Sequence, residues 1–222
     1  MPRQNRITPF GTIVATPARG TLMGNRGCLH DAAGQIRRPY QSKRWIICLL
    51  HFNQRHRTVM TPGQYTELFF LDEATALAAG HRPCAECQRD RFNHFRTLWA
   101  AANPQLAGGL TKPPATLIDT VLHEERLQPE KATVEVDQLP NGSFVALDDG
   151  NAYLVYQNKL LRWSPFGYEN IAKSVPTLAV TLLTPPSIVR MLAAGYIADL
   201  HPTAVNCINL SVRFSAALSS RR

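Results

Sequence analysis

Two cysteines three positions apart constrain the fold of this chain more than any other feature. Cys84 and Cys87 come shortly after Gly80, which suits the left-handed conformation that ends a helix, and they stand where a second helix is predicted to begin. The spacing lets both sulfurs contact one metal ion, while the following helix directs its positive end toward them. The sequence therefore predicts a zinc site.

A tetrahedral zinc ion needs four ligands, and this pair supplies two of them. We expect Cys28 and His30, which follow a glycine-rich loop, to complete the site. Cys48 is the alternative ligand, together with His51, because a two-residue gap is a known ligand spacing. Against this alternative, a regular strand would point positions 48 and 51 to opposite faces. His81 is a further candidate, although it stands very close to the cysteine pair.

The number and context of the cysteines favour metal binding over disulfides. The chain has five cysteines, an odd number, and its first residues do not resemble an export signal. A redox dithiol would require a thioredoxin-like unit, and nothing upstream of the pair resembles one. No apolar run reaches the length of about 18 residues that a membrane helix needs. We therefore expect a soluble, cytoplasmic protein with no membrane association.

The positive charge of the chain is concentrated in its first half. Residues 1–103 contain 14 Lys or Arg and 6 Asp or Glu, whereas residues 104–222 contain 10 of each kind. Arginine dominates the basic half, and its planar guanidinium group suits phosphate. A solubilising surface is the plainer interpretation, but we predict a nucleic-acid partner. The predicted phosphate contacts are Arg26, Arg37, Arg38, Arg82, Arg89 and Arg91.

Residue patterns in the first half predict short strands followed by helices. The first 30 residues are rich in glycine, proline and threonine, and the segment 21–31, which Gly20, Gly24 and Gly27 surround, reads as a tight, turn-rich loop. Asp72 is expected to cap a helix that Gly80 ends. The expected elements are strands at 45–52, 57–60 and 65–70 and helices at 73–79 and 84–102.

The second half begins after a Gly- and Pro-rich break at 103–114 and turns into a β-meander. Its hairpin signals are Pro140-Asn141-Gly142 and Asp148-Asp149-Gly150. The expected elements are a helix at 115–127, strands at 133–136, 144–147, 152–156, 159–163 and 178–183, and a helix ending at 194. We predict an α+β fold with a zinc module in 1–103 and an antiparallel meander plus helices in 104–222. The short linker allows the two regions to pack as one unit.

One stretch of the chain reads Glu73-Ala74-Thr75-Ala76-Leu77-Ala78-Ala79-Gly80-His81-Arg82-Pro83-Cys84-Ala85-Glu86-Cys87-Gln88 and follows Phe69-Phe70. This stretch, about 20 of the 222 residues, resembles the second half of the zinc-binding domain of Ada-type DNA-repair proteins. The resemblance implies a small α/β zinc domain whose last two ligands are Cys84 and Cys87. In that family the first two ligands form a Cys-x-x-x-Cys pair, and one of them accepts a methyl group from DNA. This chain has no such pair, so we do not transfer the methyl-acceptor chemistry.

Two functions fit these observations. We predict a zinc-binding protein that binds nucleic acid, such as DNA, through its arginine-rich half; whether it is an enzyme stays open. The alternative is a hydrolase or nuclease with a structural zinc module and an active site between the two halves. We interpret Glu86 as an acidic residue at the start of a helix and not as a general base. We interpret the aromatic segment 162–168 as the edge of the meander core and not as a base-stacking surface.

Overall fold

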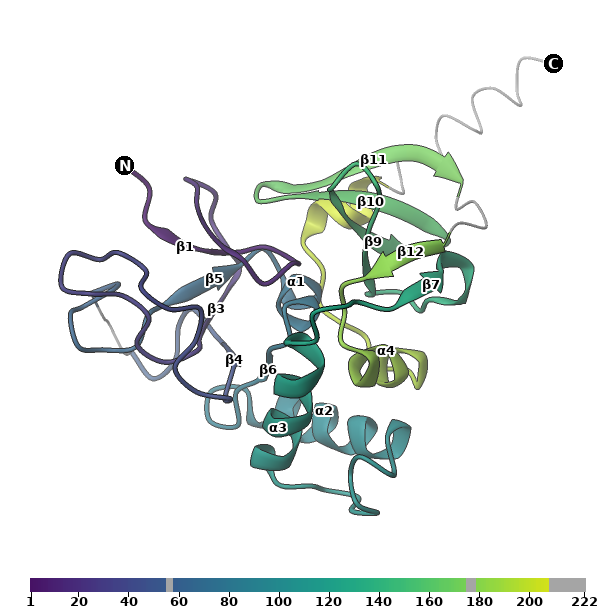
Figure 1. Cartoon of the computed structure of the whole chain (residues 1–222), viewed down its shortest axis with the longest axis horizontal. Helices are drawn as coiled ribbons and strands as arrows, with labels where there is room; N and C mark the ends of the chain where they lie inside the picture. Colours follow the sequence, from purple (N-terminus) through teal and green to yellow (C-terminus); the bar gives the residue numbers. More distant parts are fainter. Residues whose placement is uncertain (55–57, 175–178, 208–222) are drawn as a thin grey trace.

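The computed structural model describes residues 1–54, 58–174 and 179–207, with the side chains of 170–174 left aside. The fold is α+β, as the sequence predicts, and contains two six-stranded sheets. Figure 1 shows the N-terminal sheet in purple and blue beside the C-terminal sheet in green, with helix α1 (Glu73–Ala78) between them. Among the described residues, no helix has both the length and the apolar composition needed to cross a bilayer.

The N-terminal sheet has the strand order β2-β1-β5-β3-β4-β6. Its strands are β1 (Gln4–Ile7), β2 (Ile13–Ala15), β3 (Leu22–Asn25), β4 (Ile46–Cys48), β5 (Leu68–Phe70) and β6 (Arg82–Pro83). The prediction of a loop over 21–31 is wrong at 22–25, because β3 lies there, and β1 and β2 were not predicted. Gly24 explains the error: a Cβ atom on it would lie 2.1 Å from the Ile46 carbonyl oxygen, so this glycine allows close strand approach instead of making a turn.

The predicted hairpin between 45–52 and 57–60 is not formed. Strand β4 is short and pairs with β3 on one side and β6 on the other. Residues 58–60 are not a strand, and Met60 adopts a positive φ of 60° while its N–H donates to Glu67. Arg57 lies outside the described residues. Both edges of β4 are therefore taken by segments distant in sequence.

The helices of the first half follow their capping residues. Asp72 accepts a hydrogen bond from the Thr75 N–H at 2.9 Å, and Gly80 has a φ of 77°, so both predicted ends of α1 are confirmed. Helix α2 (Arg89–Ala102) begins five residues later than predicted. The cysteine pair thus lies in the turn before α2, where the Gln88 N–H donates to the Cys84 carbonyl oxygen.

The second half contains the predicted antiparallel meander. The strand order is β11-β10-β9-β8-β12-β7, and every pair is antiparallel. The strands are β7 (Thr133–Glu135), β8 (Phe144–Ala146), β9 (Ala152–Tyr156), β10 (Lys159–Ser164), β11 (Gly167–Ser174) and β12 (Ala179–Leu182). Strand β11 was not expected. The remaining elements are α3 (Ala115–Arg126), the 3-10 helix η1 (Val136–Gln138) and α4 (Pro186–Ala193).

The two halves of the chain share one apolar core and at least two buried polar contacts. The main core cluster contains Phe70 and Trp99 from the first half and Leu154 and Ile188 from the second. The start of α1 is hydrogen-bonded to the second half of the chain. Asp72 accepts from the Tyr168 hydroxyl at 2.7 Å, and Glu73 accepts from the Tyr196 hydroxyl at 2.6 Å. Helices α2, α3 and α4 lie together beside the sheets (Figure 1).

Candidate metal centre

Three cysteines meet where strands β4 and β6 end. The Sγ atoms of Cys48, Cys84 and Cys87 all lie within 4.8 Å of one another. Cys84 is buried, whereas Cys48 and Cys87 are half-buried. Among the described residues this is the one group of three or more Cys, His, Asp or Glu side chains close enough to hold a metal ion.

The parallel pairing of β4 and β6 brings Cys48 to the pair. Ile46 lies opposite Arg82 and Ile47 opposite Pro83, so the next residues, Cys48 and Cys84, lie side by side. The Cys84 N–H continues the ladder by donating to the Ile47 carbonyl oxygen at 2.8 Å. The position of Cys48 therefore follows from a strand register between segments 36 residues apart in the sequence.

Backbone donors and neighbouring thiols surround the sulfur atoms. The Glu86 N–H donates to Cys84 Sγ at 3.4 Å, and the Leu49 N–H donates to Cys87 Sγ at 3.5 Å. Hydrogen bonds from the Cys48 and Cys87 thiols, supported by backbone N–H groups, lower the pKa of Cys84. The same thiol contacts, with burial, raise the pKa of Cys48. Of Cys48 and Cys84, it is therefore Cys84 whose deprotonation these contacts favour.

The donor set and its dimensions fit a zinc ion. Tetrahedral zinc with Zn–S bonds of about 2.3 Å separates its sulfur ligands by roughly 3.8 Å. Sulfurs that all lie within 4.8 Å of one another need only small shifts to reach that spacing. Three soft sulfur donors also suit zinc better than magnesium or calcium, which prefer oxygen.

The structure does not bring Cys28 and His30 to this cluster. The His30 ring is buried and both of its nitrogens have protein partners, namely the Thr66 hydroxyl at 2.6 Å and the Thr61 carbonyl oxygen at 3.2 Å. Cys28 Sγ lies 3.7 Å from the carbonyl oxygen of His30. Cys48, the alternative ligand, lies beside Cys84 and Cys87, the place where we expected Cys28 and His30.

The other candidate residues have ordinary surroundings. Strand β4 ends at Cys48, so the objection that a continuous strand would turn His51 away no longer applies; His51 is exposed. Glu86 is exposed too, and Cys207 is buried with its Sγ 3.3 Å from the Tyr168 carbonyl oxygen. His81 is buried and accepts from Arg26 Nε at 3.2 Å.

The six arginines predicted to contact phosphate fall into two groups. Arg26 and Arg82 are buried, and Arg91 is half-buried. Arg82 forms a two-bond ion pair with Asp119 at 2.8 and 2.9 Å, and Arg91 forms an ion pair with Glu73. The exposed members are Arg37, Arg38 and Arg89. The sequence pattern alone did not separate structural arginines from surface ones.

A cleft lies between the two halves, where the alternative function would place an active site. It has a volume of about 330 Å³ and is lined by Thr8 and Phe10 from the first half and Arg162, Trp163 and Glu169 from the second, among others. The lining offers a single carboxylate and neither histidine nor cysteine, so it lacks a paired acid and base. In segment 162–168, Tyr168 is buried and Trp163 packs against the core.

Comparisons of the chain with family models, curated proteins and solved structures found no match.

Proposed function

We propose that this protein binds a zinc ion through Cys48, Cys84 and Cys87 and that its basic half binds nucleic acid. The observation that carries the proposal is the convergence of three sulfur atoms within 4.8 Å at the end of β4 and β6. A zinc ion there would cross-link β4 to the turn before α2 and so fix the start of that helix. The local resemblance to Ada-type zinc domains supports the same assignment for Cys84 and Cys87.

Nucleic acid is the partner that the charge distribution favours. The half of the chain that contains the three cysteines has 14 basic and 6 acidic residues, and it therefore carries the excess positive charge. Zinc in this setting is structural: it holds the basic half in shape, and Lys and Arg side chains contact phosphate. The cleft between the halves lacks paired catalytic groups, so we do not favour the hydrolase alternative.

Metal content tests the first part of the proposal. Protein purified under reducing conditions should contain about one zinc per chain, and Cys48→Ser, Cys84→Ser and Cys87→Ser should each lose most of it. Cys207→Ser is the matched control, because this cysteine is buried in the core away from the cluster and should leave zinc content unchanged. Full zinc content in Cys84→Ser would refute the site.

Salt dependence tests the second part. Binding of labelled DNA and RNA to the wild-type protein should weaken steeply between about 50 and 200 mM salt, because phosphate contacts release counterions. Binding that is absent at low salt, or that does not change with salt, would refute a nucleic-acid partner while leaving the zinc site intact.

A further inference from the structure

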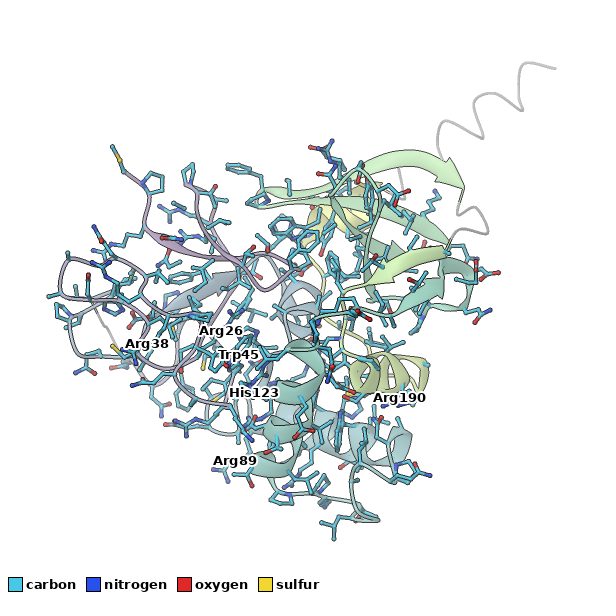
Figure 2. All side chains as sticks on the ribbon, in the orientation of Figure 1. Arg26, Arg38, Trp45, Arg89, His123 and Arg190 are labelled. Atoms are coloured by element: carbon cyan, nitrogen blue, oxygen red, sulfur yellow. The ribbon has the colours of Figure 1, made fainter. Side chains whose placement is uncertain are left out.

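Two arginines enclose a tryptophan at the end of the β4–β6 pair opposite the cysteines. The guanidinium carbon of Arg26 lies 3.7 Å from the centre of the Trp45 ring, and that of Arg126 lies 3.8 Å from it. Two planar groups this close to one ring centre cannot share a face, so the indole is sandwiched between them. Arg26 is 1% exposed and Trp45 is 5% exposed. We call these three residues the arginine stack; Figure 2 labels Arg26 and Trp45 next to each other.

The acceptors around the arginine stack are neutral. Arg26 donates to the Gly11 carbonyl oxygen at 2.9 Å and to His81 Nε2 at 3.2 Å. Arg126 donates to the carbonyl oxygens of Gly80 and Lys43, both at 2.7 Å, and to a ring nitrogen of His123. All of these acceptors are uncharged, so the bonds hold both guanidinium groups in place without neutralising either charge.

Neither charge has an acidic partner within the parts of the chain that the structure describes. No carboxylate there forms an ion pair with Arg26 or Arg126, and the nearby Asp119 is paired with Arg82. Arg26 Nη2 and Arg126 Nε have no hydrogen-bond partner among those residues. Burial, and then the charge of Arg126, lowers the pKa of Arg26; burial also lowers the pKa of Arg126, to about 9. The stack is therefore an excess of positive charge that is buried at Arg26 and half-buried at Arg126.

A basic loop lies directly over the stack. Residues 37–44 are held there because the Gln41 N–H donates to the Arg26 carbonyl oxygen at 2.9 Å and the Trp45 ring N–H donates to the Ser42 carbonyl oxygen at 3.0 Å. The loop exposes Arg38, Lys43 and Arg44.

Helix α3 adds His123 to this surface, and its ring packs against Tyr40 of the loop. The ring centre of Tyr40 lies 4.9 Å from that of His123 in an edge-on arrangement and 5.9 Å from that of Trp45. Arg126 Nη2 lies 2.8 Å from His123 Nδ1, and burial together with the charges of Arg126 and Lys43 lowers the pKa of His123. Glu124 is the acidic side chain that acts on His123 in the opposite sense.

We propose that the surface formed by Arg38, Tyr40, Lys43, Arg44 and His123, here called the stack face, binds the phosphodiester backbone of nucleic acid. This inference rests on the proposed nucleic-acid function and names the surface that carries it out. Arg26, which is buried, and Arg126, which is half-buried, form no ion pair among the described residues, so they project a positive potential toward the exposed cations of the loop. A polyanion supplies the missing negative charge, and the Tyr40 ring offers a face for an unpaired base.

The test compares two charge reversals of equal size in the full-length protein. The probes are a labelled single strand of about 20 nucleotides and the corresponding duplex, and binding is followed by fluorescence anisotropy over a salt series. Lys43→Glu with Arg44→Glu alters the stack face, whereas Lys112→Glu with Arg162→Glu reverses two exposed cations elsewhere. Zinc content and thermal unfolding of both variants show that the fold is kept.

The stack-face variant should bind at least about tenfold more weakly, and its salt slope should fall by about two, because two phosphate contacts are lost. The control should change affinity by less than about threefold. Equal weakening by both variants, or unchanged binding in the stack-face variant, would overturn the inference while wild-type binding still supports the proposed function. Wild-type protein that binds vesicles containing phosphatidylserine but neither nucleic acid would overturn both.

Discussion

At one end of the β4–β6 pair three thiols gather, and at the other end two guanidiniums enclose an indole ring. Trp45 and Cys48 are three residues apart on one short segment, which corresponds to roughly 10 Å along a strand. The sulfur end has donors that become anionic when they bind a metal, and the arginine end has cations without acidic partners in the described residues. The same two strands thus have three possible metal ligands at one end and an excess of positive charge at the other.

The difference between the two ends is also one of burial. Cys48 and Cys87 are half-buried, so an ion can reach the sulfur atoms from the surface. Arg26 is almost fully buried, so it cannot contact a ligand directly and instead acts through its charge. In the functions proposed above, the sulfur end would ligate its ion directly, whereas the arginine end would act through the surface that the 37–44 loop forms.

Removal of the Trp45 ring should have the largest effect on stability. Trp45→Ala opens a cavity and leaves two guanidiniums facing each other without the ring, so we expect a loss of about 3–5 kcal/mol in the free energy of unfolding. Urea titration measures this loss, and Trp45→Phe should lose less because an aromatic face remains. A loss below about 1 kcal/mol in the alanine variant would show that the arginine stack does not depend on the ring.

Removal of the metal should have the next largest effect and should act at the sulfur end. Ligand linkage predicts a loss of about 4 kcal/mol when free zinc falls from a thousand times its Kd to zero. Thermal unfolding with and without EDTA measures this loss. The zinc-dependent part of the stability should shrink as the pH falls, because thiols must lose protons to bind zinc. Cys84→Ser should not respond to EDTA; an equal response would place the zinc elsewhere.

Features set by local chemistry could be predicted from the sequence. Asp72 and Gly80 bound α1 as expected because a capping carboxylate and a left-handed glycine act within one turn. The hairpin turns of the second half were equally readable, and they produced the predicted antiparallel order of β8, β9 and β10. The Cys84 and Cys87 pair was recognised for the same reason.

Features set by contacts between distant segments could not be predicted. Cys48 reaches the cysteine pair through the parallel register of β4 with β6, which no short-range pattern specifies. Gly24 belongs to a strand because its neighbours leave no room for a side chain, not because the chain turns there. The burial of Arg26 depends on Trp45 and Arg126, which come from two other parts of the chain. The composition therefore predicted which half of the chain is basic, but not which of its arginines lie on the surface.

Replacement of the predicted ligands that lie outside the cluster should have a moderate effect on stability alone. His30→Ala leaves the Thr66 hydroxyl without its ring partner, so we expect a loss of about 1–3 kcal/mol in the free energy of unfolding. Zinc content should stay at about one ion per chain. Cys28→Ala should also keep its zinc. Loss of zinc from either variant, with the fold intact, would restore these residues as ligands.

The smallest effect is expected at Arg89, a predicted phosphate contact that lies away from the arginine stack. Arg89 is exposed at the first position of α2, and Figure 2 labels it below His123, on the side away from Arg26. A cation is unfavourable near a helix N-terminus, so Arg89→Ala should change stability by no more than about 0.5 kcal/mol, in the stabilising direction if at all. Its effect on nucleic-acid affinity should be less than about threefold, against tenfold for the stack-face variant. Arg89→Ala could instead weaken binding as much as Lys43→Glu with Arg44→Glu. In that case the phosphate contacts would extend to the sulfur end, and the two ends would not bind different ligands.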